Sequence, residues 1–149
     1  MTTQTKESYL GNPNVKRDGV QQEYTKKELQ EYAKCMKDPS YFAKNYCKII
    51  HLDRGLVNFE LYPYQQKMFN HFMKNRFSIV LACRQSGKSI SSVAYLLWYA
   101  LFSPEKTIAI LANKGATAQE MLGRIHLMLE NLPFFLLLSI VTLEIVANH

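Results

Sequence analysis

The sequence predicts an α/β fold with a parallel β-sheet and helices on both faces. Two short apolar runs, at 78–83 and 107–112, are each followed by residues with helical spacing. Strand, helix and strand in this order form a βαβ unit with a right-handed crossover. The 149 residues, 48% of them hydrophobic, are enough for one domain with its own core.

The chain divides into four expected segments. Composition and periodicity separate an extended polar N-terminal arm (1–23), a helical subdomain (24–62), a partial α/β domain (63–135) and an aberrant apolar tail (136–149). The longest apolar run, 132–147, includes most of this tail. Pro133 and Glu144 interrupt the run, which leaves too short a stretch to cross a membrane. Its β-branched residues favour a strand or a sticky surface.

Capping signals set the first helices. Thr25 and Glu28 have the spacing of a capping box, which predicts a helix over 26–37. Asp38 followed by Pro39 predicts the start of a second helix. A turn at Arg54-Gly55 is expected to join short strands at 49–52 and 57–61.

Helical periodicity and capping residues mark three helices in the α/β domain. They are expected at 64–75, 88–102 and about 118–132, the last capped by Thr117 and Glu120. The apolar runs 78–83 and 107–112 are expected to be buried strands, because a parallel sheet is covered on both faces.

The most informative stretch is Gly87-Lys88-Ser89, which lies between the first expected strand and a helix. Such a turn points backbone N–H groups at a phosphate, and the helix dipole adds positive potential there. Lys88 would neutralise the β- and γ-phosphates, while the Ser89 hydroxyl would ligate Mg²⁺. The stretch therefore predicts a phosphate loop for ATP and Mg²⁺; an ordinary strand-turn-helix connection is the alternative.

Three further loop residues are assigned to the nucleotide site. Arg84 is expected to reach the γ-phosphate and stabilise charge in the transition state, although a surface arginine paired elsewhere is an open alternative. Gln85 and Ser86 are included because they belong to the loop; the chemistry of Gln85 alone defines no role. The full motif has a glycine five places before Gly87, where this chain has Ala82.

Tyr64 and Gln65 precede the loop by about twenty residues. A glutamine amide offers a paired donor and acceptor to an adenine edge, and a tyrosine ring stacks on a base. Taken alone, a Tyr-Gln pair at a helix start is more simply a structural feature. Asn113-Lys114-Gly115 follows the second expected strand, where it could touch phosphate or DNA, or be a plain polar turn.

Composition narrows the function classes. The net charge of +6 suits a polyanionic partner, and equally a solvated basic surface. The three cysteines and four histidines have no metal-ligand spacing. The polar N-terminus lacks a signal-peptide core, so a reducing cytosol is expected.

The loop 83–89 reads Cys-Arg-Gln-Ser-Gly-Lys-Ser and resembles the deviant Walker A motif of the large terminase subunit of tailed bacteriophages. Tyr64-Gln65 looks like the adenine-binding motif of that family. Further similarity to its T-even myophage branch lies at 11–17, 41–47, 110–115 and 131–135. The resemblance covers about residues 11–135.

The resemblance implies an incomplete P-loop NTPase of the RecA-like ATPase type. It implies an enzyme that couples ATP hydrolysis to translocation of double-stranded DNA into a capsid, as a homo-oligomeric ring with a small terminase subunit and the portal protein, in the host cytoplasm at the capsid portal vertex. Carried over, Arg84 and Lys88 are catalytic, Ser89 binds Mg²⁺, and Tyr64, Gln65 and the loop residues bind ATP.

Departures from that family lead to further expectations. The Walker B carboxylate and the nuclease domain of the family have no counterpart here, and Glu144 is rejected as a substitute because no second carboxylate accompanies it. A truncated product, inactive alone, is therefore expected. The alternatives are a helicase-like translocase fragment and a non-catalytic nucleotide- or DNA-binding remnant.

Overall fold

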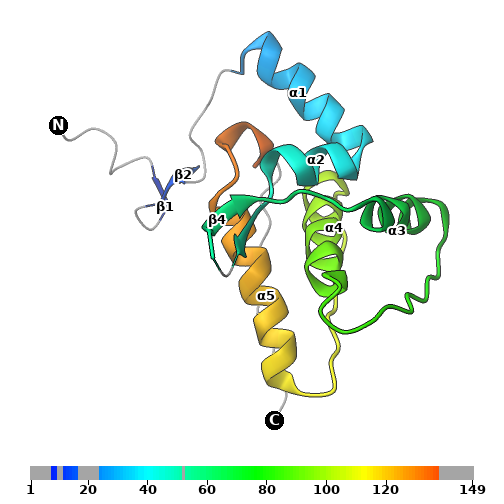
Figure 1. Ribbon diagram of the computed structural model, residues 1–149. Helices are drawn as coiled ribbons and strands as arrows, with labels where there is room; N and C mark the ends of the chain where they lie inside the picture. Colours follow the sequence, from blue (N-terminus) through cyan, green and yellow to red (C-terminus); the bar gives the residue numbers. More distant parts are fainter. Residues whose placement is uncertain (1–7, 10–11, 17–23, 52, 138–149) are drawn as a thin grey trace.

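The computed structural model describes residues 8–9, 12–16, 24–51 and 53–137. Figure 1 shows helices stacked around a central, nearly vertical α4, with a small β-hairpin beside them. The elements are β1 (Ser8–Tyr9), β2 (Asn12–Lys16), α1 (Lys26–Lys37), α2 (Pro39–Tyr46), β3 (Lys48–His51), β4 (Gly55–Asn58), α3 (Pro63–Lys74), α4 (Lys88–Phe102), α5 (Gly115–Glu130) and the 3₁₀ turn η1 (Phe134–Leu136).

The expected caps of the first two helices are confirmed. The Thr25 hydroxyl accepts a bond from the Glu28 N–H at 3.3 Å, and the Glu28 carboxylate accepts one from the Thr25 N–H at 2.8 Å. Asp38 caps α2 by accepting from the Ser40 N–H at 2.8 Å, with Pro39 in the first helical position. Each cap satisfies an N–H group that the helix leaves unpaired.

The turn at Arg54-Gly55 is also confirmed. It joins β3 to β4 in an antiparallel hairpin, with Ile49 opposite Val57. Gly55 has φ 67°, a left-handed conformation that glycine adopts without steric cost. The hairpin packs β3 against α5, which places its residues near the start of α4.

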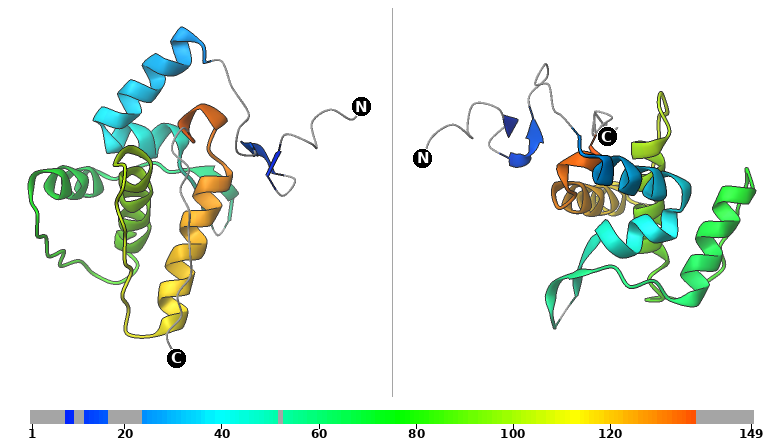
Figure 2. Two further views of the ribbon diagram at one scale, coloured as in Figure 1. Left: turned by 180° about the vertical axis from the view of Figure 1, so that it is seen from behind. Right: turned by 90° about the horizontal axis from the view of Figure 1, so that it is seen from above.

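Helix α4 is the centre of the core. It begins at Lys88 and ends at Phe102, as its sequence predicts, and buries one continuous apolar face. The Trp98 indole donates to the Cys35 carbonyl at 2.7 Å and so ties α4 to α1. Helices α2, α3 and α5 also pack on α4, as both views in Figure 2 show. The core therefore holds the first turn of α4 in a fixed position.

Helix α5 differs from its expected start. It begins at Gly115, after Lys114 as N-cap, with no side-chain cap bond. The expected cap by Thr117 and Glu120 is wrong, because both residues already lie inside the helix. In the 3₁₀ turn η1 that follows α5, Leu136 is fully buried in the core. Leu136 therefore belongs to the packed domain, whereas the rest of the expected tail, after Leu137, lies outside the described residues.

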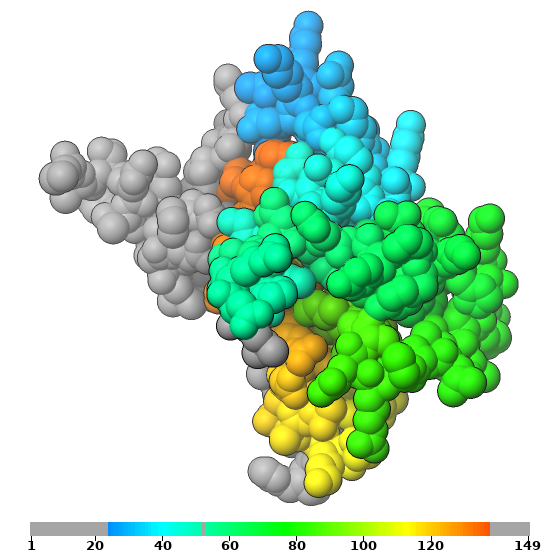
Figure 3. All heavy atoms as spheres, viewed as in Figure 1, coloured from blue at the N-terminus to red at the C-terminus, as the bar shows by residue number. Residues whose placement is uncertain are grey.

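The two expected buried strands do not form in the structure. Residues 77–83 and 107–112 have no strand assignment, and they lie apart, the first on the side of α4 where α3 packs and the second behind α4 in the view of Figure 1. Ile79 is 97% exposed, Leu81 100% and Leu111 93%. Figure 3 shows the first segment at the molecular surface, in green at the right. A parallel strand requires a hydrogen-bonded neighbour, and no described residue supplies one.

The sheets among the described residues are two antiparallel pairs, β1 with β2 and β3 with β4. The N-terminal arm was expected to be extended, and its described residues form two short paired strands, with Ser8 opposite Lys16. The parallel P-loop sheet remains a prediction from the sequence. Of the expected βαβ unit, the structure forms the helices and the loop that leads into α4, but not the strands.

Candidate phosphate-binding site

The loop before α4 folds tightly around one carbonyl oxygen. The Cys83 carbonyl accepts a bond from the Ser86 hydroxyl at 3.0 Å and another from the Lys88 ammonium at 3.2 Å. Gln85 and Gly87 have φ values of 60° and 78°. A left-handed residue other than glycine costs on the order of 1–3 kcal/mol. The turn is therefore held in a strained conformation by its own hydrogen bonds.

Gly87 is required at the start of α4 for two reasons. Its φ of 78° is left-handed, and a Cβ atom there would lie 2.8 Å from the Nε2 atom of Gln65. The first turn of α4 is also tied to the loop by the Ser91 hydroxyl, which donates to the Gly87 carbonyl at 2.9 Å. A side chain at this position would be strained by the left-handed backbone and would crowd the Gln65 amide.

Tyr64 and Gln65 lie behind the loop and bond to its backbone. The Tyr64 hydroxyl donates to the Ser86 carbonyl, and the Gln65 amide donates to the Gly87 carbonyl at 3.5 Å. The Gln65 carbonyl accepts from the Tyr62 N–H at 2.8 Å, and the side chain is only 1% exposed. Both polar atoms of Gln65 are thus engaged with backbone, which matches the structural interpretation of the Tyr-Gln pair.

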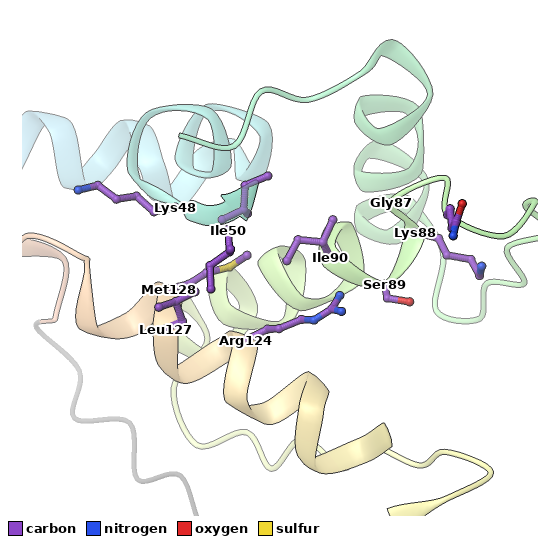
Figure 4. Close-up of a pocket in the computed structure, with 11 residues that line it drawn as sticks. Lys48, Ile50, Gly87, Lys88, Ser89, Ile90, Arg124, Leu127 and Met128 are labelled. Atoms are coloured by element: carbon purple, nitrogen blue, oxygen red, sulfur yellow. The ribbon is translucent and has the colours of Figure 1, made fainter. Parts of the chain in front are cut away.

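A cavity of about 630 Å³ opens in front of the loop. Figure 4 shows it between the β3–β4 hairpin, the first turn of α4 and the middle of α5. Part of its wall is apolar and part is polar; the lining residues are Lys48, Ile49, Ile50, Gln85, Gly87, Lys88, Ser89, Ile90, Arg124, Leu127 and Met128. Such a volume is within the usual range of small-molecule sites.

The structure brings together part of the expected site. Gln85, Gly87, Lys88 and Ser89 line the cavity, while Arg84 and Ser86 do not. Arg84 is exposed and has no ion pair among the described residues. Ser89 is exposed at the first turn of α4, where its hydroxyl is accessible to a ligand.

Two basic residues of the cavity were not expected from the sequence. Lys48 lies on β3 and Arg124 on α5, and neither is near the loop in sequence. In Figure 4 the Arg124 side chain extends toward Ser89, whereas the Lys48 ammonium points away from the loop. Only the packing of α5 against α4, and of β3 against α5, reveals this proximity, so no sequence motif could have found it.

The charge at the loop is positive. No aspartate or glutamate is among the residues that line the cavity. Nor do the described ranges contain any group of three or more His, Cys, Asp or Glu side chains placed to hold a metal ion. Because Arg124 is paired with Glu120, the helix dipole and the ammonium of Lys88 are the groups that favour an anion in front of α4.

Asn113-Lys114-Gly115 lies at the start of α5 and is exposed. None of the three residues lines the cavity. The interpretation as a plain polar turn fits their position, and a contact with DNA remains a prediction.

Comparison with protein-family models finds no match for this chain. Within the described part of the chain, every helix is too short or too polar to span a lipid bilayer.

Proposed function

We propose that this chain binds MgATP at the loop 83–89 and is the nucleotide-binding part of a phage DNA-packaging ATPase, the large terminase subunit. One observation carries the proposal: a glycine-dependent loop delivers Lys88 and Ser89, at the N-terminus of a buried helix, to an open cavity without acidic residues. Backbone N–H groups, an ammonium and a hydroxyl are the groups that a triphosphate and its Mg²⁺ need.

The chemistry assigned to each residue follows from its atoms. Lys88 donates to the Cys83 carbonyl at 3.2 Å, and a phosphate oxygen can replace this neutral acceptor with a charged one. Charge-assisted hydrogen bonds are about twice as strong as neutral ones. Ser89 would ligate the Mg²⁺ that bridges the outer phosphates. Arg84, exposed beside the loop, would approach the γ-phosphate if the loop adjusts around it.

Hydrolysis demands more than binding. A phosphoryl-transfer site needs a carboxylate near the metal and a group that orients the attacking water. The cavity lining supplies neither. We therefore expect nucleotide binding with little or no turnover from this chain alone.

The packaging role rests on the resemblance of spaced motifs to the terminase family. It implies double-stranded DNA, a small terminase subunit and a portal protein as partners, and a homo-oligomeric ring in the host cytoplasm. The net charge of +6 is compatible with DNA as a partner. A helicase-like translocase is the second candidate, favoured by the same loop and an upstream glutamine; a non-catalytic remnant that binds nucleotide or DNA is the third.

The test is an ATP-binding and turnover assay on the purified chain, with and without double-stranded DNA. We expect MgATP to raise the melting temperature of the wild type but not of Lys88→Ala, and phosphate release to stay near background in both. Absence of a Lys88-dependent shift would refute the nucleotide site. Rapid Lys88-dependent turnover would refute the expectation of an inactive chain.

A further inference from the structure

The middle of α5 faces the phosphate loop across the cavity. Arg124 lines this cavity together with Lys88 and Ser89, and Figure 4 shows its side chain reaching toward Ser89. The two cations belong to different helices, α4 and α5, that pack against each other. A polyphosphate that leaves the loop and enters the cavity therefore meets the guanidinium on the opposite wall.

Arg124 has a carboxylate partner one helical turn away. Its Nη2 atom lies 2.5 Å from an oxygen of Glu120, and the side chains of Arg124 and Glu120 are 40% and 61% exposed. Exposed pairs at this spacing contribute little to stability. The pair can therefore be broken at small cost, which leaves the guanidinium available to another anion.

A phosphate is the stronger competitor for this guanidinium. Arginine presents planar paired donors that match a phosphate as well as a carboxylate, and a terminal phosphate carries more charge than Glu120. Lys88 and Ser89 would hold a metal-bound, multiply charged anion in the same cavity. Attraction toward that anion favours rotation of Arg124 away from Glu120.

We propose that Arg124 is a second cationic ligand of the bound nucleotide, and that it exchanges Glu120 for the terminal phosphate of a nucleoside triphosphate. This inference rests on the proposed function of the loop. Because Lys88 lies at the loop and Arg124 on the far wall, Lys88 holds both di- and triphosphates, whereas Arg124 reads the outermost phosphate. The exchange couples α5 to the presence of that phosphate.

The test is calorimetric titration of MgATP and MgADP into the full chain and its variants at fixed ionic strength. We expect Arg124→Gln to weaken the binding of MgATP about tenfold or more, and the binding of MgADP by less than about threefold. Arg76→Gln is the matched control, because Arg76 lies over the Phe77 ring outside this cavity; it should leave both affinities within about twofold. Arg124→Lys should recover part of the ATP preference, since it restores the charge without the paired donors.

Glu120→Gln tests the exchange without removing the guanidinium. It should raise the affinity for MgATP a few-fold, and it should have no effect on that affinity in an Arg124→Gln background. The inference is overturned if Arg124→Gln and Arg76→Gln behave alike, if ATP and ADP are weakened equally, or if Glu120→Gln leaves MgATP unchanged. Lys88-dependent binding with no Arg124 effect would overturn this inference alone, whereas absence of wild-type binding would overturn the proposed function as well.

Discussion

The Nε2 atom of Gln65 lies 3.5 Å from the carbonyl oxygen of Gly87, and it would lie 2.8 Å from a Cβ atom added at position 87. The N-terminus of α3 and the N-terminus of α4 are joined at this point, 22 residues apart in sequence. The position of the loop 83–89 therefore depends on a buried amide that does not line the cavity.

Replacement of Gln65 by alanine should destabilise the fold. The change leaves the Tyr62 N–H without its side-chain partner and removes one donor from the Gly87 carbonyl, which keeps its bonds from Ser91. An unsatisfied polar group costs about 1–3 kcal/mol. Urea unfolding measures the loss. Gln66→Ala, at an exposed position on the same helix, should change stability by less than about 0.5 kcal/mol.

The same variant separates two roles for Gln65. If Gln65 supports the loop, its replacement should weaken the binding of ATP and of GTP by the same factor, because both nucleotides share the triphosphate. If Gln65 contacts adenine, its replacement should weaken the binding of ATP more than the binding of GTP. From the two backbone bonds of Gln65 we expect the equal loss, and competition binding with both nucleotides measures it.

Replacement of Gly87 by alanine should be more damaging than its small size suggests. The left-handed conformation costs an L-residue about 1–2 kcal/mol, and the new Cβ atom would displace Gln65. Gly123→Ala is the matched control, because Gly123 lies inside α5 with nothing within 4 Å of an added Cβ. That change should stabilise the helix by about 1 kcal/mol. Urea unfolding should show a lower free energy of unfolding for Gly87→Ala and a higher one for Gly123→Ala. A lower free energy of unfolding in both variants would contradict the account.

Thiol labelling should distinguish the three cysteines. Cys35 and Cys47 are buried; burial raises the pKa of Cys35 to about 12 and also raises the pKa of Cys47. Because the thiolate is the reactive form, neither should react near pH 8. Cys83 is exposed at the loop, so one thiol should react in the native chain and all three after unfolding. MgATP should slow the reaction of Cys83, and equal rates with and without MgATP would count against a ligand at the loop.

The apolar segments beside α4 should promote self-association. Ile79, Leu81 and Leu111 are almost fully exposed, and unpaired apolar segments are sites of edge-to-edge pairing. Leu81→Lys should lower the associated fraction in light scattering. Met36→Lys, a change of the same charge at a half-exposed position on α1, should have little effect. A wild-type chain that is monomeric at high concentration would contradict this prediction.

Local signals in the sequence predicted much of the fold. The capping box at Thr25, the Asp38-Pro39 start and the turn at Gly55 depend on neighbouring residues alone, and all three are confirmed. The bounds of α4 follow from Gly87 before it and Ser103-Pro104 after it. These features need no distant contact, which is why the sequence was sufficient.

Features that depend on distant contacts were not predicted. The segment 78–83 has the composition of a buried strand, but a strand forms only against a neighbour, and the described residues contain none. In the site, Lys88 and Ser89 were identified by their motif, whereas Arg124 enters only because α5 packs beside α4. The bonds of Gln65 to the backbone of Tyr62 and Gly87 likewise depend on how α3 meets the loop.

Calorimetric titration of MgATP into the wild type and into Lys88→Ala tests the central claim most directly. The ammonium of Lys88 is the charge that the loop 83–89 brings to the cavity, so its removal should abolish measurable binding while the urea midpoint changes little. We predict saturable, single-site binding to the wild type and none to Lys88→Ala. Equal binding by both chains, or heat from neither, would contradict the assignment of a phosphate site.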